Sequence, residues 1–138
     1  MGDRKADIDL AKEFLLTAKN DLKSAEIELE GKIFNNSVYH SQQAVEKSIK
    51  ALLIMENKFL ETHFVADRAA KILDKEVIQK AKSLEKYWIL TRYPSKKKTE
   101  IWSPVKEFTE LEAKEAFEKA KFVVERIEKI LKEKYGVE

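Results

Sequence analysis

The sequence contains no cysteine, and only three glycines and two prolines occur among its 138 residues. Without cysteine, the chain has neither a disulfide framework nor a metal site with thiolate ligands. The scarcity of glycine and proline leaves little turn chemistry for an all-β fold. No apolar run approaches the ~18 residues of a membrane span, and the first ten residues lack the apolar stretch of a secretory signal. These absences predict a cytoplasmic protein without a membrane segment.

Sites that depend on short motifs are also missing. The sequence has two histidines, His40 and His63, and neither an HExxH pair nor a glycine-rich phosphate loop. A di-iron helical bundle needs a Glu three residues before a ligand histidine, but Ser37 and Leu60 occupy those positions. Two histidines without cysteine do not predict a zinc site. We therefore expect no metal and no cofactor.

Positive and negative charges are nearly balanced. The formal net charge is +2, which is too small to indicate a nucleic-acid-binding protein by itself. The distribution is more informative than the sum, because Lys96, Lys97 and Lys98 are consecutive. Abundant Lys and Glu together with the lack of cysteine are typical of a thermophile.

Helical periodicity is the main pattern that is present. Apolar residues recur at three- and four-residue steps, as they do on the buried faces of helices. This spacing predicts helices over residues 5–30 and 34–57, two short helices between residues 62 and 90, and a last helix over residues 109–135. We therefore expect an all-α fold, an up-and-down bundle of four to five helices in one domain over residues 1–138.

Helix ends are indicated by their capping residues. Gly31 is the expected stop of the first long helix. Asn35 or Asn36 is the expected cap of the second. Thr109 and Glu112 have the spacing of a capping box for the last helix.

The second long helix is expected at the centre of the bundle. Residues 49–55 are apolar on nearly every side, so more than one neighbour must cover them. A two-layer bundle should not need all of this apolar surface. We therefore expect a homodimer, in which a C2 contact buries the surplus.

A polar stripe on the same helix is the first candidate site. It includes His40, Gln43 and Lys47, with Glu46 and Lys50 close beside it. His40 could act as a general acid or base, as histidines in catalytic sites do. The alternative is a hydrogen-bonded histidine beside the core or at a subunit contact. Glu46 and Lys50, four residues apart, could simply stabilise the helix by about 0.2–0.5 kcal/mol.

Residues 91–108 form the second candidate site. They show no regular period, and two prolines interrupt them. Such a long irregular segment is usually functional or mobile. Arginine offers a rigid fork for phosphate, and an aromatic ring can stack on a base. The alternative is a solvated lysine loop with a tryptophan folded back over the core. The candidate ligand-binding residues here are Arg92, Tyr93, Lys96, Lys97, Lys98 and Trp102.

The sequence resembles the HEPN domains (higher eukaryotes and prokaryotes nucleotide-binding). The stretch SVYHSQQAVEKSIKALL at 37–53, Thr62-His63 before a short helix, and the Arg92-Tyr93-Pro94 segment carry the resemblance, which covers nearly the whole chain. It implies a helical bundle that is commonly a homodimer. It also implies a gene often encoded beside a small nucleotidyltransferase as a toxin–antitoxin pair.

Many members of that family are ribonucleases that act through an Arg and a His with four to six residues between them. Arg92 is similar to that Arg, but Lys and Thr residues stand at 97–99, where the His should be. This departure argues against metal-independent RNA cleavage by the usual pair. On the second helix, Glu46 and Lys50 are the nearest match to the family's frequent polar positions.

Three functions are consistent with these features. The leading hypothesis is a HEPN-type module that binds nucleotide or RNA phosphates and pairs with a nucleotidyltransferase. The second is an endoribonuclease with a non-standard base, either His40 or His63, that folding brings near Arg92. The third is a purely structural dimerising bundle. Convergence of a His nitrogen and the Arg92 guanidinium on one cleft would favour catalysis, whereas His63 by itself is expected to be structural.

Overall fold

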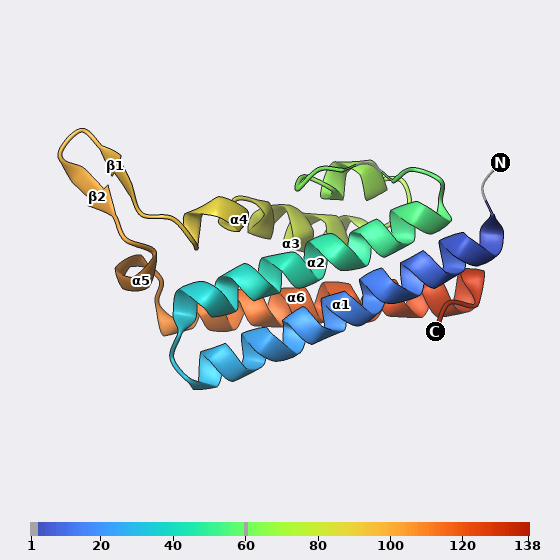
Figure 1. The fold of residues 1–138 in the computed structure, drawn as a ribbon, viewed down its shortest axis with the longest axis horizontal. Coiled ribbons are helices and arrows are strands. Elements are labelled where there is room, and N and C mark those ends of the chain that lie inside the picture. The colour runs from blue at the N-terminus through green and yellow to red at the C-terminus, as the bar shows by residue number, and fades with distance from the viewer. Residues whose placement is uncertain (1–2, 60) are drawn as a thin grey trace.

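The structure is a computed structural model that describes residues 3–59 and 61–138. Three long helices lie side by side along the molecule, α1 (Arg4–Glu30), α2 (Phe34–Met55) and α6 (Glu110–Tyr135) (Figure 1). The shorter helices α3 (Lys75–Glu85) and α4 (Tyr87–Leu90) follow one another along α2 (Figure 1). The fold is therefore the all-α bundle that the periodicity predicts.

Helix α1 begins and ends where local chemistry favours it. The side chain of Asp3 caps its first turn by accepting a hydrogen bond from the Lys5 backbone N–H. The N–H of Gly31 donates to the Ile27 carbonyl at 2.9 Å, so the predicted stop is in the right place. The left-handed conformation nevertheless falls one residue later, at Lys32, where φ is 63°.

The predicted asparagine cap of α2 is wrong. Ile33 occupies the N-cap position and provides no side-chain cap, while the Ser37 N–H donates to the Ile33 carbonyl at 3.0 Å. The Asn35 side chain instead donates to the Thr91 carbonyl at 3.1 Å. A tertiary hydrogen bond has therefore taken the side chain that the local pattern assigned to the helix end.

Helix α2 is the centre of the bundle, as expected. It packs against α1, α6, α3 and α4, and Ile49, Leu52 and Leu53 are completely buried. The chain's own helices thus cover the apolar surface at residues 49–55. This surface therefore gives no argument for a second copy, and the expected homodimer stays a prediction.

The connection from α2 to α3 contains a 3₁₀ helix, η1 (Ala66–Ala69). Helix α3 then starts after Asp74, whose side chain accepts a hydrogen bond from the Val77 N–H at 3.0 Å. The two short helical segments predicted here are therefore separate, although the first is shorter than a regular α-helix needs.

The segment over residues 91–108 is not irregular. It forms an antiparallel hairpin of β1 (Ser95–Lys97) and β2 (Glu100–Trp102), followed by the one-turn helix α5 (Pro104–Glu107). Strands of three residues are too short to show a sequence period. The two-residue turn also contains no glycine that would have indicated it in the sequence. Lys98 adopts the positive φ of 57° that a glycine usually takes in such a turn. The hairpin projects from one end of the bundle (Figure 1).

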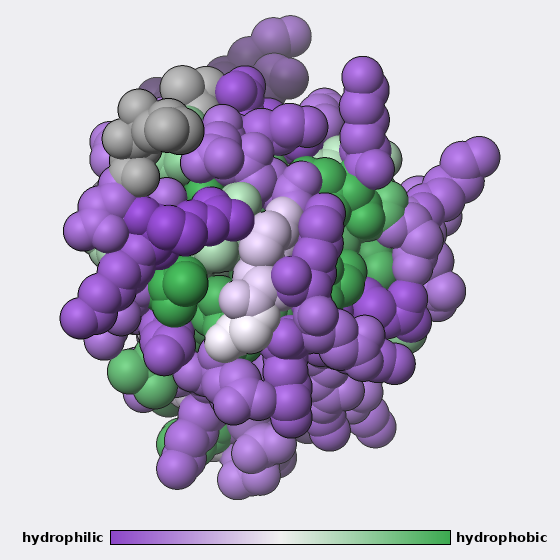
Figure 2. All heavy atoms as spheres, turned by 90° about the vertical axis from the view of Figure 1, so that its right-hand side faces the viewer, coloured by the Kyte–Doolittle hydropathy of each residue, from purple (hydrophilic) through white to green (hydrophobic). Residues whose placement is uncertain are grey.

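Helix α6 has the capping box predicted from the sequence. The Thr109 hydroxyl accepts from the Glu112 N–H, and the Glu112 carboxylate accepts from the Thr109 N–H. Gly136 ends the helix at a φ of 68°. At the end where α1 begins and α6 stops, polar side chains cover most of the surface, with hydrophobic patches between them (Figure 2). Within the described residues, no helix is long and apolar enough to cross a membrane.

Candidate functional site

The candidate site is built around Arg92, in the turn that follows α4. Helical hydrogen bonding continues past Leu90, because the N–H of Arg92 donates to the Ile89 carbonyl at 3.2 Å. Side chains hold the carbonyls of this last turn. The Thr91 hydroxyl donates to the Tyr87 carbonyl at 2.7 Å, and the Trp102 indole donates to the Leu90 carbonyl at 2.8 Å. Arg92 therefore projects from a well-fixed backbone.

The guanidinium of Arg92 lies among three aromatic rings. Its central carbon is 4.8 Å from the ring centroid of Tyr39, 5.0 Å from that of Tyr93 and 5.6 Å from that of Trp88. Its Nε donates to the Trp88 carbonyl at 2.9 Å. These contacts are favourable for a cation, and no carboxylate of the described residues forms an ion pair with it. Its terminal N–H groups therefore remain suited to an anionic ligand.

His63 is brought to the same place from the loop after α2. Its ring stacks on the indole of Trp88, with 4.2 Å between centroids and 15° between planes. Its Nδ1 donates to Glu46 Oε1 at 3.0 Å. Trp88 thus contacts both His63 and Arg92, which the sequence separates widely. We call Tyr39, His63, Trp88, Arg92 and Tyr93 the aromatic–arginine cluster.

Beneath this cluster, Glu46 is a buried carboxylate with three partners. Its side chain is only 5% exposed. Besides His63, the Gln42 amide donates to Oε1 and the Lys50 ammonium donates to Oε2, each at 3.2 Å. A carboxylate without such partners would be strongly unfavourable at this depth. The predicted Glu46–Lys50 pair is therefore part of a network that fixes His63.

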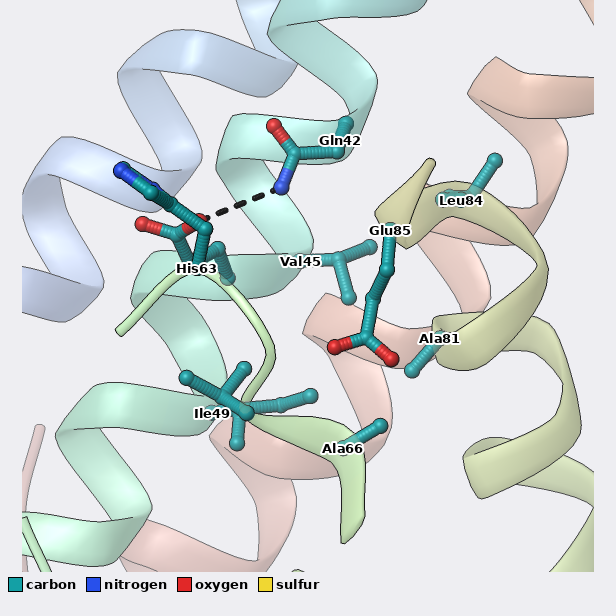
Figure 3. A pocket seen from close by; sticks show the side chains of 10 residues that line it. Gln42, Val45, Ile49, His63, Ala66, Ala81, Leu84 and Glu85 are labelled. Atoms are coloured by element: carbon teal, nitrogen blue, oxygen red, sulfur yellow. Dashed lines mark hydrogen bonds and ion pairs between the residues drawn. The ribbon is translucent and has the colours of Figure 1, made fainter. Parts of the chain in front are cut away.

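A small cavity adjoins the network on the side of α3. It has a volume of about 10 Å³, and α2, the loop of His63 and α3 line it (Figure 3). This volume suits about one water molecule. Glu85 reaches into this space from α3, and its buried Oε2 has no hydrogen-bond partner among the described residues. Burial raises the pKa of Glu85, although backbone N–H groups of Ala66 and Val65 oppose this.

The other polar-stripe candidates face α1 or each other. His40 Nδ1 lies 2.6 Å from Glu28 Oε1 on α1, and its ring contacts the edge of Tyr39. Lys47 donates to Asp21 at 2.7 Å, and the Gln43 amide donates to the Gln42 side chain at 2.7 Å. The stripe therefore divides: Glu46 contacts His63 directly, Lys50 bonds the other oxygen of Glu46, and His40 and Lys47 face α1.

The remaining candidates lie on the hairpin. Trp102 is folded back, with its ring 5.9 Å from that of Phe108, as the structural alternative requires. Lys96, Lys97 and Lys98 are exposed, and no ion pair holds them within the described part of the chain. The hairpin that carries them projects from the end of the bundle (Figure 1), so they lie on a different element from the rings of Tyr39, His63 and Trp88.

Three members of the site, Tyr39, Gln42 and Trp88, are not among the candidates predicted from the sequence. Trp88 stands four residues before Arg92, a spacing that places both on one side of a helical turn. Gln42 is an amide among apolar neighbours in the sequence, a signal that could have indicated a buried polar network. Among the described residues, acidic and histidine side chains form no group able to hold a metal ion.

Comparison with known proteins agrees with this architecture. The sequence model of the HEPN domain matches residues 11–130. A protein of Methanocaldococcus jannaschii named "Putative toxin MJ1304" is 38% identical over an alignment of 149 residues. The alignment includes 99% of this chain and 98% of the relative.

Two crystal structures have a similar fold. TT1696 from Thermus thermophilus has a TM-score of 0.77 and 27% identity, over 86% of this chain and 96% of that one. ST0689, described as an archaeal HEPN homologue, has a TM-score of 0.72 and 23% identity, over 86% and 95% respectively, and so shares the fold. The family match over most of the sequence leads to one conclusion: this chain belongs to the HEPN domain family.

Proposed function

We propose that this protein is a toxin-like HEPN module that binds a phosphate group of a nucleotide or RNA at Arg92. The observation that carries the proposal is the guanidinium among three aromatic rings, with no acidic partner in the described part of the chain. Arginine that is fixed in this way can bind a phosphate through two parallel hydrogen bonds. Its Nε is already used by the Trp88 carbonyl, so the terminal nitrogens would make these bonds.

The aromatic side chains suggest how a base could bind beside the phosphate. Tyr93 is 56% exposed, and stacking of a base on an exposed aromatic ring tolerates any base. The cavity next to Glu46 is far too small for a nucleotide. The ligand would therefore lie on the outer surface of the cluster, with Lys96 to Lys98 adding a positive potential that attracts it.

The comparisons support a proposal for the biological setting. The relative from M. jannaschii carries the name of a toxin, and the family resemblance implies a small nucleotidyltransferase as the antitoxin. We extend the toxin role and the nucleotidyltransferase partner to this chain, which would form a homodimer and act as one half of a cytoplasmic toxin–antitoxin pair. Co-purification followed by mass spectrometry tests the partner.

Titration of nucleotides and short RNAs tests the phosphate site. Arg92→Lys keeps the charge but loses the bidentate fork, so binding should weaken roughly tenfold. A triple Lys→Ala variant at 96–98 should lower affinity and salt dependence without changing which nucleotide is preferred. Lys132→Ala, an exposed lysine on α6, is the matched control. Absence of binding by the parent protein at low salt would leave a purely structural role as the better explanation.

A second candidate function is an endoribonuclease that uses His63 as its base. It is favoured by a specific observation, because His63 and Arg92 both contact Trp88 and Glu46 bonds Nδ1 of His63. That bond would leave Nε2 free to accept a proton, as in other acid–base sites. His63→Gln should then abolish RNA cleavage while phosphate binding persists. His40→Gln, a change at the other histidine, should have little effect on cleavage.

A further inference from the structure

The β1–β2 hairpin has features that phosphate binding does not explain. Trp102, at the end of β2, attaches the hairpin to the Leu90 carbonyl and to the Phe108 ring, and the rest of the hairpin projects at one end of the bundle (Figure 1). A single two-stranded hairpin is at best marginally stable in water. The turn adds strain, because Lys98 has a positive φ of 57° that glycine would adopt more readily. Such a hairpin gains stability when something packs against it.

Its positive charge is uncompensated. Among the described residues, Lys96, Lys97 and Lys98 form no ion pair, whereas lysines elsewhere pair with acidic side chains on neighbouring elements. Glu100 stands opposite Lys97 in the hairpin register, whereas Lys96 stands opposite Ile101, so a carboxylate faces one of the two lysines of β1. The surface therefore suits a partner that carries negative charge.

The same segment exposes large apolar side chains. Ile101 is 63% exposed and Val105 is 77% exposed, and Tyr93 precedes the hairpin with 56% exposure. Ile101 stands directly opposite Lys96 in the register, so an aliphatic and a cationic side chain share one face of the hairpin. A sugar–phosphate backbone offers no apolar pocket for isoleucine or valine, but a protein partner does.

The hairpin also presents an unpaired strand edge. The pair that closes a two-residue turn, Lys97 and Glu100, exchanges hydrogen bonds, and the next pair does not. The backbone N–H and C=O of Lys96 should therefore face away from β2. A further strand can add to such an edge. Lysines along β1 oppose pairing with a second β1, since like charges would lie opposite one another.

We propose that β1 is the docking edge for an extended segment of a partner protein that alternates acidic and apolar residues. The segment pairs with the backbone of Lys96, places its carboxylates on the face of Lys97, and places its apolar side chains on the opposite face, which carries Ile101 and the aliphatic stem of Lys96. The lysines that prevent self-association thereby select an acidic strand. This docking does not depend on phosphate binding at Arg92.

The test uses a labelled synthetic peptide of alternating Glu and Val as the acidic probe, with the corresponding Gln–Val peptide as the uncharged control. The acidic peptide should bind at low salt and slow the amide exchange of Lys96. A Lys96→Glu, Lys97→Glu double variant and an Ile101→Ser variant should each weaken binding roughly tenfold. Ile101 is exposed, so its change leaves the bundle folded. Lys132→Glu on α6 and Arg92→Lys should leave peptide binding unchanged.

Other occupants give other results. If the peptide fails to bind the parent protein, or binds the Ile101→Ser variant equally well, the docking proposal is overturned. If a short uridylate oligomer binds instead, and only the Lys96→Glu, Lys97→Glu variant loses this binding, the hairpin is an RNA contact. If Ile101→Ser converts a dimer to a monomer in sedimentation, the occupant is a second copy. Loss of phosphate binding in Arg92→Lys with retained peptide binding separates this proposal from the proposed function.

Discussion

Replacing Glu46 by Gln should show how much the buried network contributes to stability. Gln keeps the shape and one acceptor oxygen, which can still accept from Gln42 or His63. Its amide N–H₂ group would then face the Lys50 ammonium, which now lies 3.2 Å from Oε2. A hydrogen bond between charged groups contributes about 1.5–3 kcal/mol. We therefore expect Glu46→Gln to lower the free energy of unfolding by ~2 kcal/mol, and Glu46→Ala to lower it by about 3–5 kcal/mol.

Urea unfolding of a double-mutant cycle measures this coupling. Lys50→Met removes the ammonium and keeps the aliphatic stem, so no donor is left facing the amide. The cost of Glu46→Gln should be clearly smaller in the Lys50→Met background than in the parent. Lys80→Met, which breaks a more exposed helical pair with Glu76, is the matched control and should show no coupling. An equal cost in both backgrounds would refute the network.

Three further predictions concern other parts of the molecule. The folded-state pKa of Glu85 is raised by burial, so the stability that its proton confers is present at low pH and lost as pH rises through that pKa; Glu85→Gln should stabilise the protein at neutral pH in thermal melts, and the gain should vanish on acidification. Ile49→Ala should cost about 2–5 kcal/mol in urea unfolding, while Lys132→Ala should stay within about 0.5 kcal/mol; equal effects would mean that the helix faces are misassigned. Lys98→Gly should relieve the positive φ and slow amide exchange in the hairpin, whereas faster exchange would contradict the strain.

Local sequence patterns identified the long helices for a physical reason. A buried helix face repeats every three to four residues. Thr109 and Glu112 cap the last helix through hydrogen bonds between residues only three apart. The hairpin escaped prediction because three-residue strands repeat too few times to show a period. The Asn35 cap was wrong because a distant carbonyl, that of Thr91, competes for the same side chain.

The candidate site was predicted in part. Arg92 and Tyr93 were identified because basic and aromatic residues gather in one segment, and Glu46 because it lies four residues before Lys50. The position of His63 could not be derived, since it depends on how the loop after α2 returns across Trp88 and Glu46. Contacts of this kind are set by packing of whole elements, and no local spacing encodes them.

The positions of the chain ends affect how this protein can be handled in experiments. Helix α1 begins and α6 stops at one end of the bundle, and the hairpin projects from the other (Figure 1). Val137, next to the last residue, is completely buried, whereas Glu138 is exposed. A tether at the N-terminus leaves the packing of Val137 untouched. Molecules immobilised through it would all present the hairpin to solution, which makes surface-based binding measurements directly interpretable.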